Sequence, residues 1–184
     1  MSEDSVLWPN WATEDVEIVG YDPAWAMHGA KERCRLRALL APWIAEGVEH
    51  VGSTAVPGLA AKPIIDLQAL VTNLEVADAI AAKLAPHQWH YVPPCLDRRL
   101  DRRFFVKVVD GRRTAHLHLL TNDSARWHQQ LAFRDALRID PDLVRTYADL
   151  KIQLAKHHRH DREAYTAGKQ LFINEVLTRH AHDN

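Results

Sequence analysis

Small and hydroxyl-bearing residues follow a short predicted strand near residue 50 and form a loop suited to binding phosphate. Gly52, Ser53 and Thr54 come directly after the strand, and Lys62 follows a few residues later. Small residues let the backbone approach an anion, while hydroxyl and N–H groups hold its oxygens and a lysine adds charge. The loop is not a Walker A motif, because Leu59 stands where that motif requires lysine. An ordinary strand-to-helix connection is the alternative interpretation.

Asp66 interrupts an apolar run, residues 63–71, that predicts a central strand. A carboxylate in a buried strand is costly unless it is paired or bound to a metal ion. Alternation along the strand places Asp66 and Gln68 on one face. We therefore expect Asp66 to be a catalytic and metal-binding carboxylate beside the phosphate loop, with an ion pair to a nearby arginine as the alternative.

His116 and His118 lie on one face of a later predicted strand, residues 113–120. Two imidazoles at this spacing can bind a metal ion or hold a phosphate, and imidazole would suit Zn²⁺. We expect both to be catalytic candidates and His118 to join Asp66 in binding a metal. The alternatives are a merely polar strand face and a fragment of a histidine-triad site with His116 as nucleophile. Thr114 stands where the first histidine of that triad belongs.

Two tyrosine–lysine pairs at helical spacing occur near the C-terminus, Tyr147 with Lys151 and Tyr165 with Lys169. Arg134, on an earlier predicted helix, can hold a carboxylate or phosphate between its two nitrogens. We expect Arg134, Tyr147, Lys151 and Lys169 to face the cleft and bind an acidic co-substrate. Lysines lying along exposed aromatic rings, and an internal ion pair for Arg134, are the alternatives.

The pattern of apolar and turn-forming residues predicts a mixed fold. Strands are expected over residues 16–20, 48–51, 63–71, 89–92, 103–109 and 113–120, and helices over 22–46, 74–85, 123–138, 140–157 and 161–179. The order indicates an N-terminal arm (1–15), an α+β core (16–121) and a helical region packed on it (122–184). Trp8 and Trp11 of the arm are expected to dock by their indoles, and a loose arm is the alternative. Asp110-Gly111 predicts a tight hairpin.

Composition narrows the classes of function. The chain has 184 residues, with 23 Lys and Arg against 24 Asp and Glu. This balance makes long nucleic acid an improbable partner, since no bulk basic charge attracts it. No apolar stretch is long enough to span a membrane, and we expect a cytoplasmic protein. Cys34 and Cys95 lack the paired spacing of a zinc site and are expected to be buried free thiols.

Three blocks of this chain together resemble the GrpB family. They are the loop and strand from His50 to Asp66, the segment His116-Leu117-His118, and the helical residues from Phe133 to Lys151 with Tyr165 and Lys169 beyond. This family is similar to the DNA polymerase beta-like nucleotidyltransferases. The resemblance implies a nucleotidyltransferase-like mixed sheet flanked by helices, followed by a C-terminal helical bundle. It also implies a nucleoside triphosphate substrate and a divalent metal, Mg²⁺ or Mn²⁺.

The chain departs from the superfamily pattern at the acids. A Gly-Ser turn precedes the first acid at the expected distance, with twelve residues between Ser53 and Asp66. Gln68 replaces the second acid, and His116 and His118 occupy the strand where a third is expected. Our leading expectation is metal-dependent transfer of a nucleotidyl group from a nucleoside triphosphate to a small molecule. The alternative is a non-catalytic protein that binds a nucleotide or phosphometabolite on a degenerate nucleotidyltransferase fold.

Overall fold

The computed structural model describes Trp11 and residues 14–182, and Trp8 lies outside this part. A five-stranded sheet forms the centre, in the order β1-β2-β5-β4-β3. Its strands are β1 Ile44–Val51, β2 Ile65–Val71, β3 Trp89–Val92, β4 Arg103–Val109 and β5 Arg112–Leu120. Only β2 and β5 pair in parallel, and the remaining neighbours are antiparallel. The expected α+β class with a mixed sheet is therefore confirmed.

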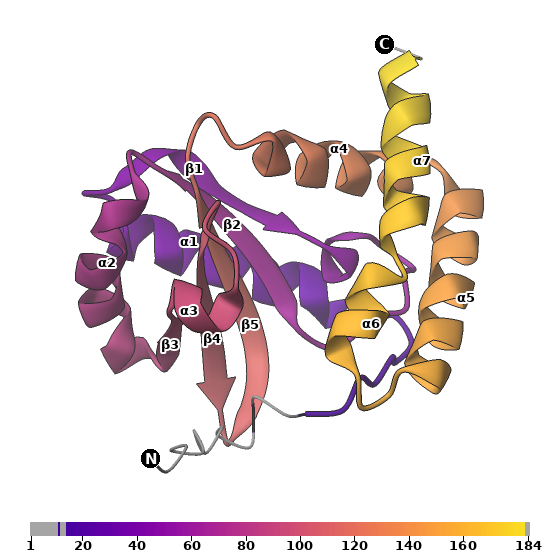
Figure 1. Ribbon diagram of the computed structural model, residues 1–184, viewed down its shortest axis with the longest axis horizontal. Helices are drawn as coiled ribbons and strands as arrows, with labels where there is room; N and C mark the ends of the chain where they lie inside the picture. Colours follow the sequence, from indigo (N-terminus) through magenta and orange to yellow (C-terminus); the bar gives the residue numbers. More distant parts are fainter. Residues whose placement is uncertain (1–10, 12–13, 183–184) are drawn as a thin grey trace, which may run out of the picture.

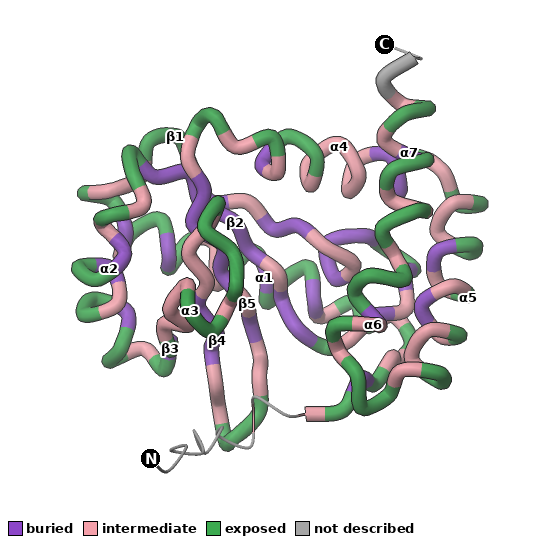
Figure 2. The backbone as a smooth tube through the Cα atoms, viewed as in Figure 1, coloured by how far each residue is buried: buried purple, intermediate pink, exposed green. Residues whose placement is uncertain are grey.

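One face of the sheet carries the main core. Inward-facing residues of the central strands, including Leu67, Ala69, Leu117 and Phe105, pack with residues of two helices. These helices are α1 Ala24–Leu39 and α2 Ala77–Leu84, and Figure 2 shows the central strands largely buried. Because side chains alternate across a strand, burying this face turns the polar residues of β2 and β5 to the other face.

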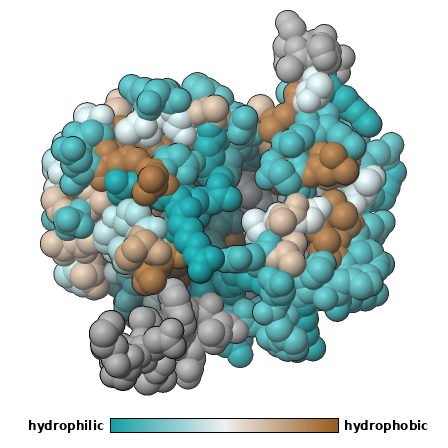
Figure 3. All heavy atoms as spheres, in the orientation of Figure 1, coloured by the Kyte–Doolittle hydropathy of each residue, from teal (hydrophilic) through white to brown (hydrophobic). Residues whose placement is uncertain are grey.

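The second face is only partly covered. Helix α4, Ala125–Ile139, packs Trp127 and Leu131 against Leu70 and Leu120 at one end of β2 and β5. The remaining helices are α5 Pro141–His157, α6 Arg162–Ala167 and α7 Gln170–His182, which stand beside the sheet in Figure 1. Figure 3 shows a hollow on this side, between the sheet and helices α6 and α7.

Short helical turns fill the connections. They are η2 Ser53–Ala55, η3 Leu74–Val76, η4 Ala85–His87 and α3 Pro94–Asp97. The predicted hairpin between β4 and β5 is confirmed, with positive φ angles of 51° at Asp110 and 74° at Gly111. Asp140 caps α5 as expected, because its side chain accepts hydrogen bonds from the first backbone N–H groups of the helix.

Several local predictions are wrong. The first helix ends at Leu39 rather than Glu46, because Pro42 disfavours helix at the residue before it, and Glu46 and Gly47 belong to β1. Residues 16–20 form one isolated bridge, between Val19 and Ala61, instead of a strand. Cys34 and Cys95 are exposed rather than buried.

The predicted last helix is broken into α6 and α7 at Gly168 and Lys169. A Cβ atom at Gly168 would lie 2.4 Å from Leu154 Cδ2, so glycine allows α6 to end directly against α5. The break matters for the site below, because it places Lys169 in a turn rather than on the face of a continuous helix.

The described part of the N-terminal arm docks on the rest of the chain. The Trp11 ring lies 5.3 Å from the Arg113 guanidinium and 5.6 Å from the His90 ring. The Val16 N–H donates to the carbonyl of Arg159, which ties the arm to the end of α5. Within residues 11 and 14–182, no helix has the length and apolar character required to cross a membrane.

Candidate functional site

The turn after β1 and the carboxylate on β2 meet at Gly52. Val51, the last residue of β1, pairs with Asp66. Gly52 has φ 71° and ψ −171°, a backbone conformation that is essentially restricted to glycine. A Cβ atom there would lie 2.7 Å from Asp66 Oδ2. The Gly-Ser turn therefore lies directly beside the Asp66 carboxylate, as the spacing in the sequence predicts.

Asp66 and His116 form a hydrogen-bonded pair. The parallel register of β2 and β5 sets the two residues opposite each other, and His116 Nδ1 lies 2.9 Å from Asp66 Oδ1. Burial lowers the pKa of His116 below 6.5 although Asp66 opposes this. Burial raises the pKa of Asp66, but the hydrogen bond from His116 and the charge of Lys62 outweigh it, so the pKa lies below 3.8.

These shifts define the state of the pair at neutral pH. Asp66 is ionised and accepts from Nδ1–H of a neutral His116. Nε2 of His116 then keeps its lone pair, and it is buried without a hydrogen-bond partner among the described residues. The Asp66 side chain is 34% exposed. The pair therefore has the arrangement of a general base, with a carboxylate orienting the imidazole.

His118 is held differently and does not contact Asp66. Its Nδ1 accepts a hydrogen bond of 2.9 Å from Arg102, whose guanidinium also binds Asp97 through two nitrogens. Its ring stacks on Phe104, with centroids 5.0 Å apart. Burial and the charge of Arg102 hold the pKa of His118 well below 6.5. The expected Asp66–His118 metal pair is thus not assembled, and His116 occupies the place beside Asp66.

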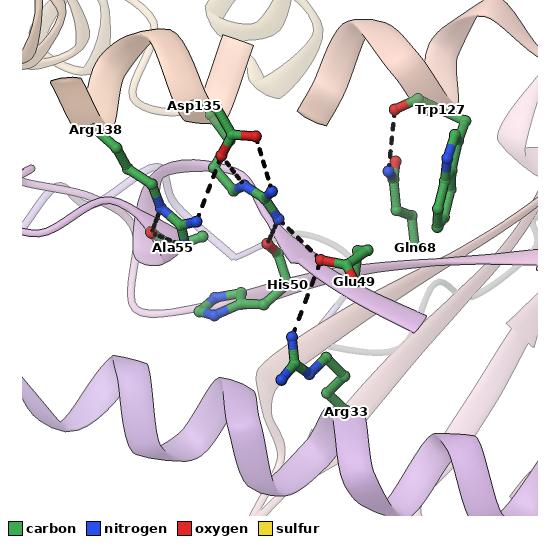
Figure 4. Close-up of polar contacts among 9 residues, drawn as sticks. Arg33, Glu49, His50, Ala55, Gln68, Trp127, Asp135 and Arg138 are labelled. Carbon is green, nitrogen blue, oxygen red and sulfur yellow. Dashed lines mark hydrogen bonds and ion pairs between the residues drawn. The ribbon is translucent and has the colours of Figure 1, made fainter. Parts of the chain in front are cut away.

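Gln68, which stands in place of a second acid, contributes to the fold. Its Nε2 donates to the Trp127 carbonyl at 3.1 Å, and its side chain is fully buried (Figure 4). This hydrogen bond joins β2 to the first turn of α4. Gln68 Oε1 is buried without a partner in the described part of the chain.

Lys151 reaches the Gly-Ser turn from α5. Its ammonium group donates to Ser53 Oγ at 2.8 Å and to the Ala60 carbonyl, and it lies 4.7 Å from the centre of the Tyr147 ring. Lys151 is only 2% exposed. Burial, followed by the charges of Lys169 and Lys62, lowers the pKa of Lys151 to about 7. Lys151 therefore lies at the Gly-Ser turn, and its expected contact with a co-substrate stays a prediction.

Two further lysines share the ring of Tyr165. The ammonium of Lys62 lies 5.1 Å from the ring centre and that of Lys169 lies 4.6 Å from it. Neither has a hydrogen-bonded or ion-paired carboxylate among the described residues. Burial and Lys169 lower the pKa of Lys62 to about 8, and burial also lowers the pKa of Lys169. These ammonium groups are desolvated and close together, an arrangement that an anion would stabilise.

Arg126, at the start of α4, adds a fourth cation. Its charge lowers the pKa of Lys169, and the charge of Asp66 raises the pKa of Arg126 in turn. Burial together with Arg102 and Arg99 lowers the pKa of Arg126 to about 10. Its Nε is buried without a hydrogen-bond partner in the described structure. Lys62, Lys151, Lys169 and Arg126 are hereafter called the cationic cluster.

The donors at this site do not fit a catalytic Mg²⁺ or Zn²⁺ ion. Mg²⁺ requires several oxygen ligands, yet within the described residues no group of three or more His, Cys, Asp or Glu side chains converges. Asp66 Oδ1 already accepts from His116, and Gln68 Oε1, although it has no partner in the described part of the chain, is a neutral oxygen on a fully buried side chain. His118 offers no free Nδ1, since Arg102 donates to it. The cationic cluster would also repel a divalent ion.

Two other residues expected at the site support the fold. Thr54 is buried, and its hydroxyl donates to the Ile64 carbonyl and accepts from His50 Nε2. Tyr147 is buried in an aromatic cluster, stacked on Phe172 with the ring centres 5.1 Å apart. The hydrogen bonds of Thr54 stabilise the Gly-Ser turn. Tyr147 packs α5 against α7.

Arg134 lies outside the cationic cluster, in the network of Figure 4. Its guanidinium donates to Asp135, to Glu49 and to the His50 carbonyl, which anchors α4 to β1. Beside it, a cavity of about 430 Å³ is lined by residues of α1, β1, the Gly-Ser turn and α4, including Arg33, Glu49, His50, Arg134 and Arg138. Arg134 therefore anchors α4 and lines this cavity, and its expected contact with an acidic co-substrate stays a prediction.

Sequence reasoning missed Arg126 and did not distinguish the two histidines. Arg126 follows a predicted helix start among polar residues, a context that carries no signal of burial. His116 and His118 share one strand face, but only the register between β2 and β5 decides which one meets Asp66.

Comparison with known proteins identifies the family of this chain. The model of the GrpB protein family matches residues 15–179. The UPF0157 protein PA4798 of Pseudomonas aeruginosa is 39% identical over 183 residues, covering 96% of this chain and 72% of that protein. The crystal structure of GrpB from Enterococcus faecalis is 32% identical and superimposes with a TM-score of 0.78, covering 91% of this chain and 98% of the other.

The fold extends to more distant enzymes. The Cid1 poly(U) polymerase superimposes with a TM-score of 0.58 over 82% of this chain and 49% of its own, at 14% identity. At this sequence identity, the likeness shows a shared fold and does not show a shared activity or substrate. The chain thus belongs to the GrpB protein family and has a nucleotidyltransferase-like fold.

Proposed function

We propose that this GrpB protein binds a phosphorylated small molecule, a nucleoside triphosphate above all, beside the Gly-Ser turn. The observation that carries this proposal is the cationic cluster, in which Lys151 donates to Ser53 while Lys62 and Lys169 lie over the Tyr165 ring, and the charges of all three act on Asp66 or on one another. Like charges so close together destabilise the protein unless an anion joins them. A di- or triphosphate offers both the charge and the acceptor oxygens that ammonium groups and a serine hydroxyl bind.

Ser53 and Lys151 are suited to hold the terminal phosphate groups. The Lys151–Ser53 hydrogen bond orients the hydroxyl, and the neighbouring Gly52 has no side chain to keep the ligand from the backbone. Lys62 and Lys169 are held against Tyr165, so little side-chain freedom is lost when they bind an anion. The site is therefore preorganised for phosphate.

Isothermal titration calorimetry tests this proposal. The protein is titrated with ATP, GTP, CTP, UTP and pyrophosphate, each in EDTA and again with saturating Mg²⁺. We expect binding in at least one of these conditions, and the same binding in a Lys156→Met control, which removes an exposed lysine of α5. Absence of binding by every compound in both conditions would contradict the proposal.

The Asp66–His116 pair favours a second candidate function, transfer of a nucleotidyl group. In such a reaction, Nε2 of His116 takes the proton from an acceptor hydroxyl, and the freed oxygen attacks the α-phosphorus. The bond from the α-phosphorus to the leaving oxygen breaks, and pyrophosphate departs with its charge held by the cationic cluster. The pair contributes the base through its unpartnered Nε2.

Pyrophosphate release from each nucleoside triphosphate, measured with pools of hydroxyl-bearing metabolites, tests this second function. His116→Ala should reduce turnover by about a hundredfold or more while leaving pyrophosphate affinity within about twofold. Equal turnover in His116→Ala and the parent protein would remove His116 from the mechanism. Absence of release with every pool would leave binding as the function.

A further inference from the structure

At the Gly-Ser turn, Lys151 donates to Ser53 and the Asp66 carboxylate lies beside Gly52, while Lys62 and Lys169 share the Tyr165 ring. Lys62 and Lys151 are coupled, since the charge of Lys62 lowers the pKa of Lys151. Lys169 and Arg126 are coupled in the same way. Within the described residues, no three or more His, Cys, Asp or Glu side chains gather as they would around a metal ion.

We infer that the cationic cluster replaces the divalent metal ion, so that this protein takes up the phosphate groups of its ligand as a metal-free anion. The inference rests on the proposed function and adds the ionic form of the ligand. In metal-dependent phosphoryl chemistry, a divalent ion bound by carboxylates neutralises the phosphate oxygens. Here Gln68 is neutral and bound to Trp127, and the lysines supply the positive charge instead.

The positions of the lysines agree with this exchange of roles. Lys151 comes from α5 and contacts the turn, whereas Lys169 from the turn after α6 and Lys62 from the segment before β2 meet over Tyr165. The cations thus come from separate elements. A chelated Mg²⁺ would enter among them with its own double charge. It would also reduce the negative charge of the phosphate that they attract. Both effects weaken binding of the metal complex relative to the free anion.

Titration with inorganic pyrophosphate in EDTA and in saturating Mg²⁺ tests the inference. We expect the dissociation constant in EDTA to equal or fall below that in Mg²⁺. We also expect Lys169→Met to raise the dissociation constant measured in EDTA about tenfold or more. In Lys156→Met, this dissociation constant should equal that of the parent protein. Removal of a desolvated charge favours folding, and thermal unfolding of each variant checks that it does fold.

Each outcome has one meaning. Tighter binding in Mg²⁺ than in EDTA, or binding in EDTA that Lys169→Met leaves intact, overturns the metal-free site while the proposed ligand class stands. Absence of pyrophosphate and nucleotide binding in both solutions overturns the proposed function itself, and the inference with it.

Discussion

Lys151 donates a hydrogen bond to Ser53 Oγ across 2.8 Å, joining residues 98 positions apart in the chain. The contact ties α5 to the turn after β1, so a C-terminal helix contributes a side chain to the proposed phosphate site. A second bond from Lys151 to the Ala60 carbonyl fixes the ammonium in place. The turn and the helix therefore form one structural unit around the expected ligand.

Lys151→Met tests this unit. We expect pyrophosphate affinity to fall about tenfold to a hundredfold, because one charge-assisted hydrogen bond to the anion is lost. The free energy of unfolding of the unliganded protein should stay the same or rise, because a desolvated charge is removed. Titration calorimetry and urea denaturation measure the two effects. Lys156→Met is the matched control on the same helix, and an unchanged affinity in Lys151→Met would contradict the account.

Asp66→Asn distinguishes a lysine-based site from a metal-based one. The substitution removes the negative charge beside the cluster and keeps an oxygen that can accept from His116. We expect pyrophosphate to bind about threefold to tenfold more tightly in EDTA, since repulsion between Asp66 and the anion disappears. Calorimetry in EDTA measures this change. Weaker binding in Asp66→Asn would indicate that the carboxylate helps to hold the ligand, as it would through a metal ion.

The pH dependence of ligand affinity should follow the lysines. The pKa is about 7 for Lys151 and about 8 for Lys62. The groups that act on the two are Lys169, Asp66, Arg113 and Arg162. Because an anion binds the protonated form of lysine, pyrophosphate affinity should fall as pH rises from 7 to 9. A constant affinity over this range, measured by calorimetry, would mean that these lysines do not bind the anion.

The free energy of unfolding of the unliganded protein should rise with pH, whereas the ligand affinity falls. The pKa of Lys151 is depressed from 10.5 in the unfolded chain to about 7 in the folded protein. Between these values the unfolded state binds more protons, so Lys151 makes the free energy of unfolding rise with pH from 7 to 10. Urea denaturation across this range measures the slope. Lys151→Met should reduce it, and an equal slope in both proteins would contradict the assignment.

Gly52→Ala tests the close approach of the turn to Asp66. The backbone conformation of Gly52 is one that essentially only glycine adopts. In addition, the Cβ atom of an alanine at this position would lie 2.7 Å from Asp66 Oδ2. Gly58 has φ 77° with open space around it, and Gly47 has open space without a positive φ. We expect unfolding free energy to fall by about 3 kcal/mol in Gly52→Ala and by about 1 kcal/mol in Gly58→Ala. Gly47→Ala should be nearly neutral, and equal losses at Gly52 and Gly58 would contradict the contact.

Local signals in the sequence were sufficient for much of the fold. Asp140-Pro141 and Asp110-Gly111 specify a helix start and a hairpin through the chemistry of their own residues. The prediction of the first helix is too long, because the helical spacing of apolar residues continues past Pro42. Proline disfavours helix at the residue before it, and this local effect outweighs the spacing. The break at Gly168 depends on contact with Leu154 of α5, which no local pattern contains.

The site was predictable only as far as spacing determines it. The Gly-Ser turn and Asp66 meet because β1 and β2 pair antiparallel with Val51 opposite Asp66, and the short connection between the two strands limits where Asp66 can lie. The choice of His116 over His118 depends on strand register, a tertiary property. Lys151 and Arg126 reach the site through helix packing, so their residue types alone could not assign them to it.

A crystal structure of the protein with pyrophosphate, grown in EDTA, tests the central claim most directly. The account predicts phosphate oxygens within hydrogen-bond distance of Ser53 Oγ and of the ammonium groups of Lys151 and Lys169. Pyrophosphate bound instead in the cavity beside Arg33 and Arg138, with the cationic cluster empty, would contradict it.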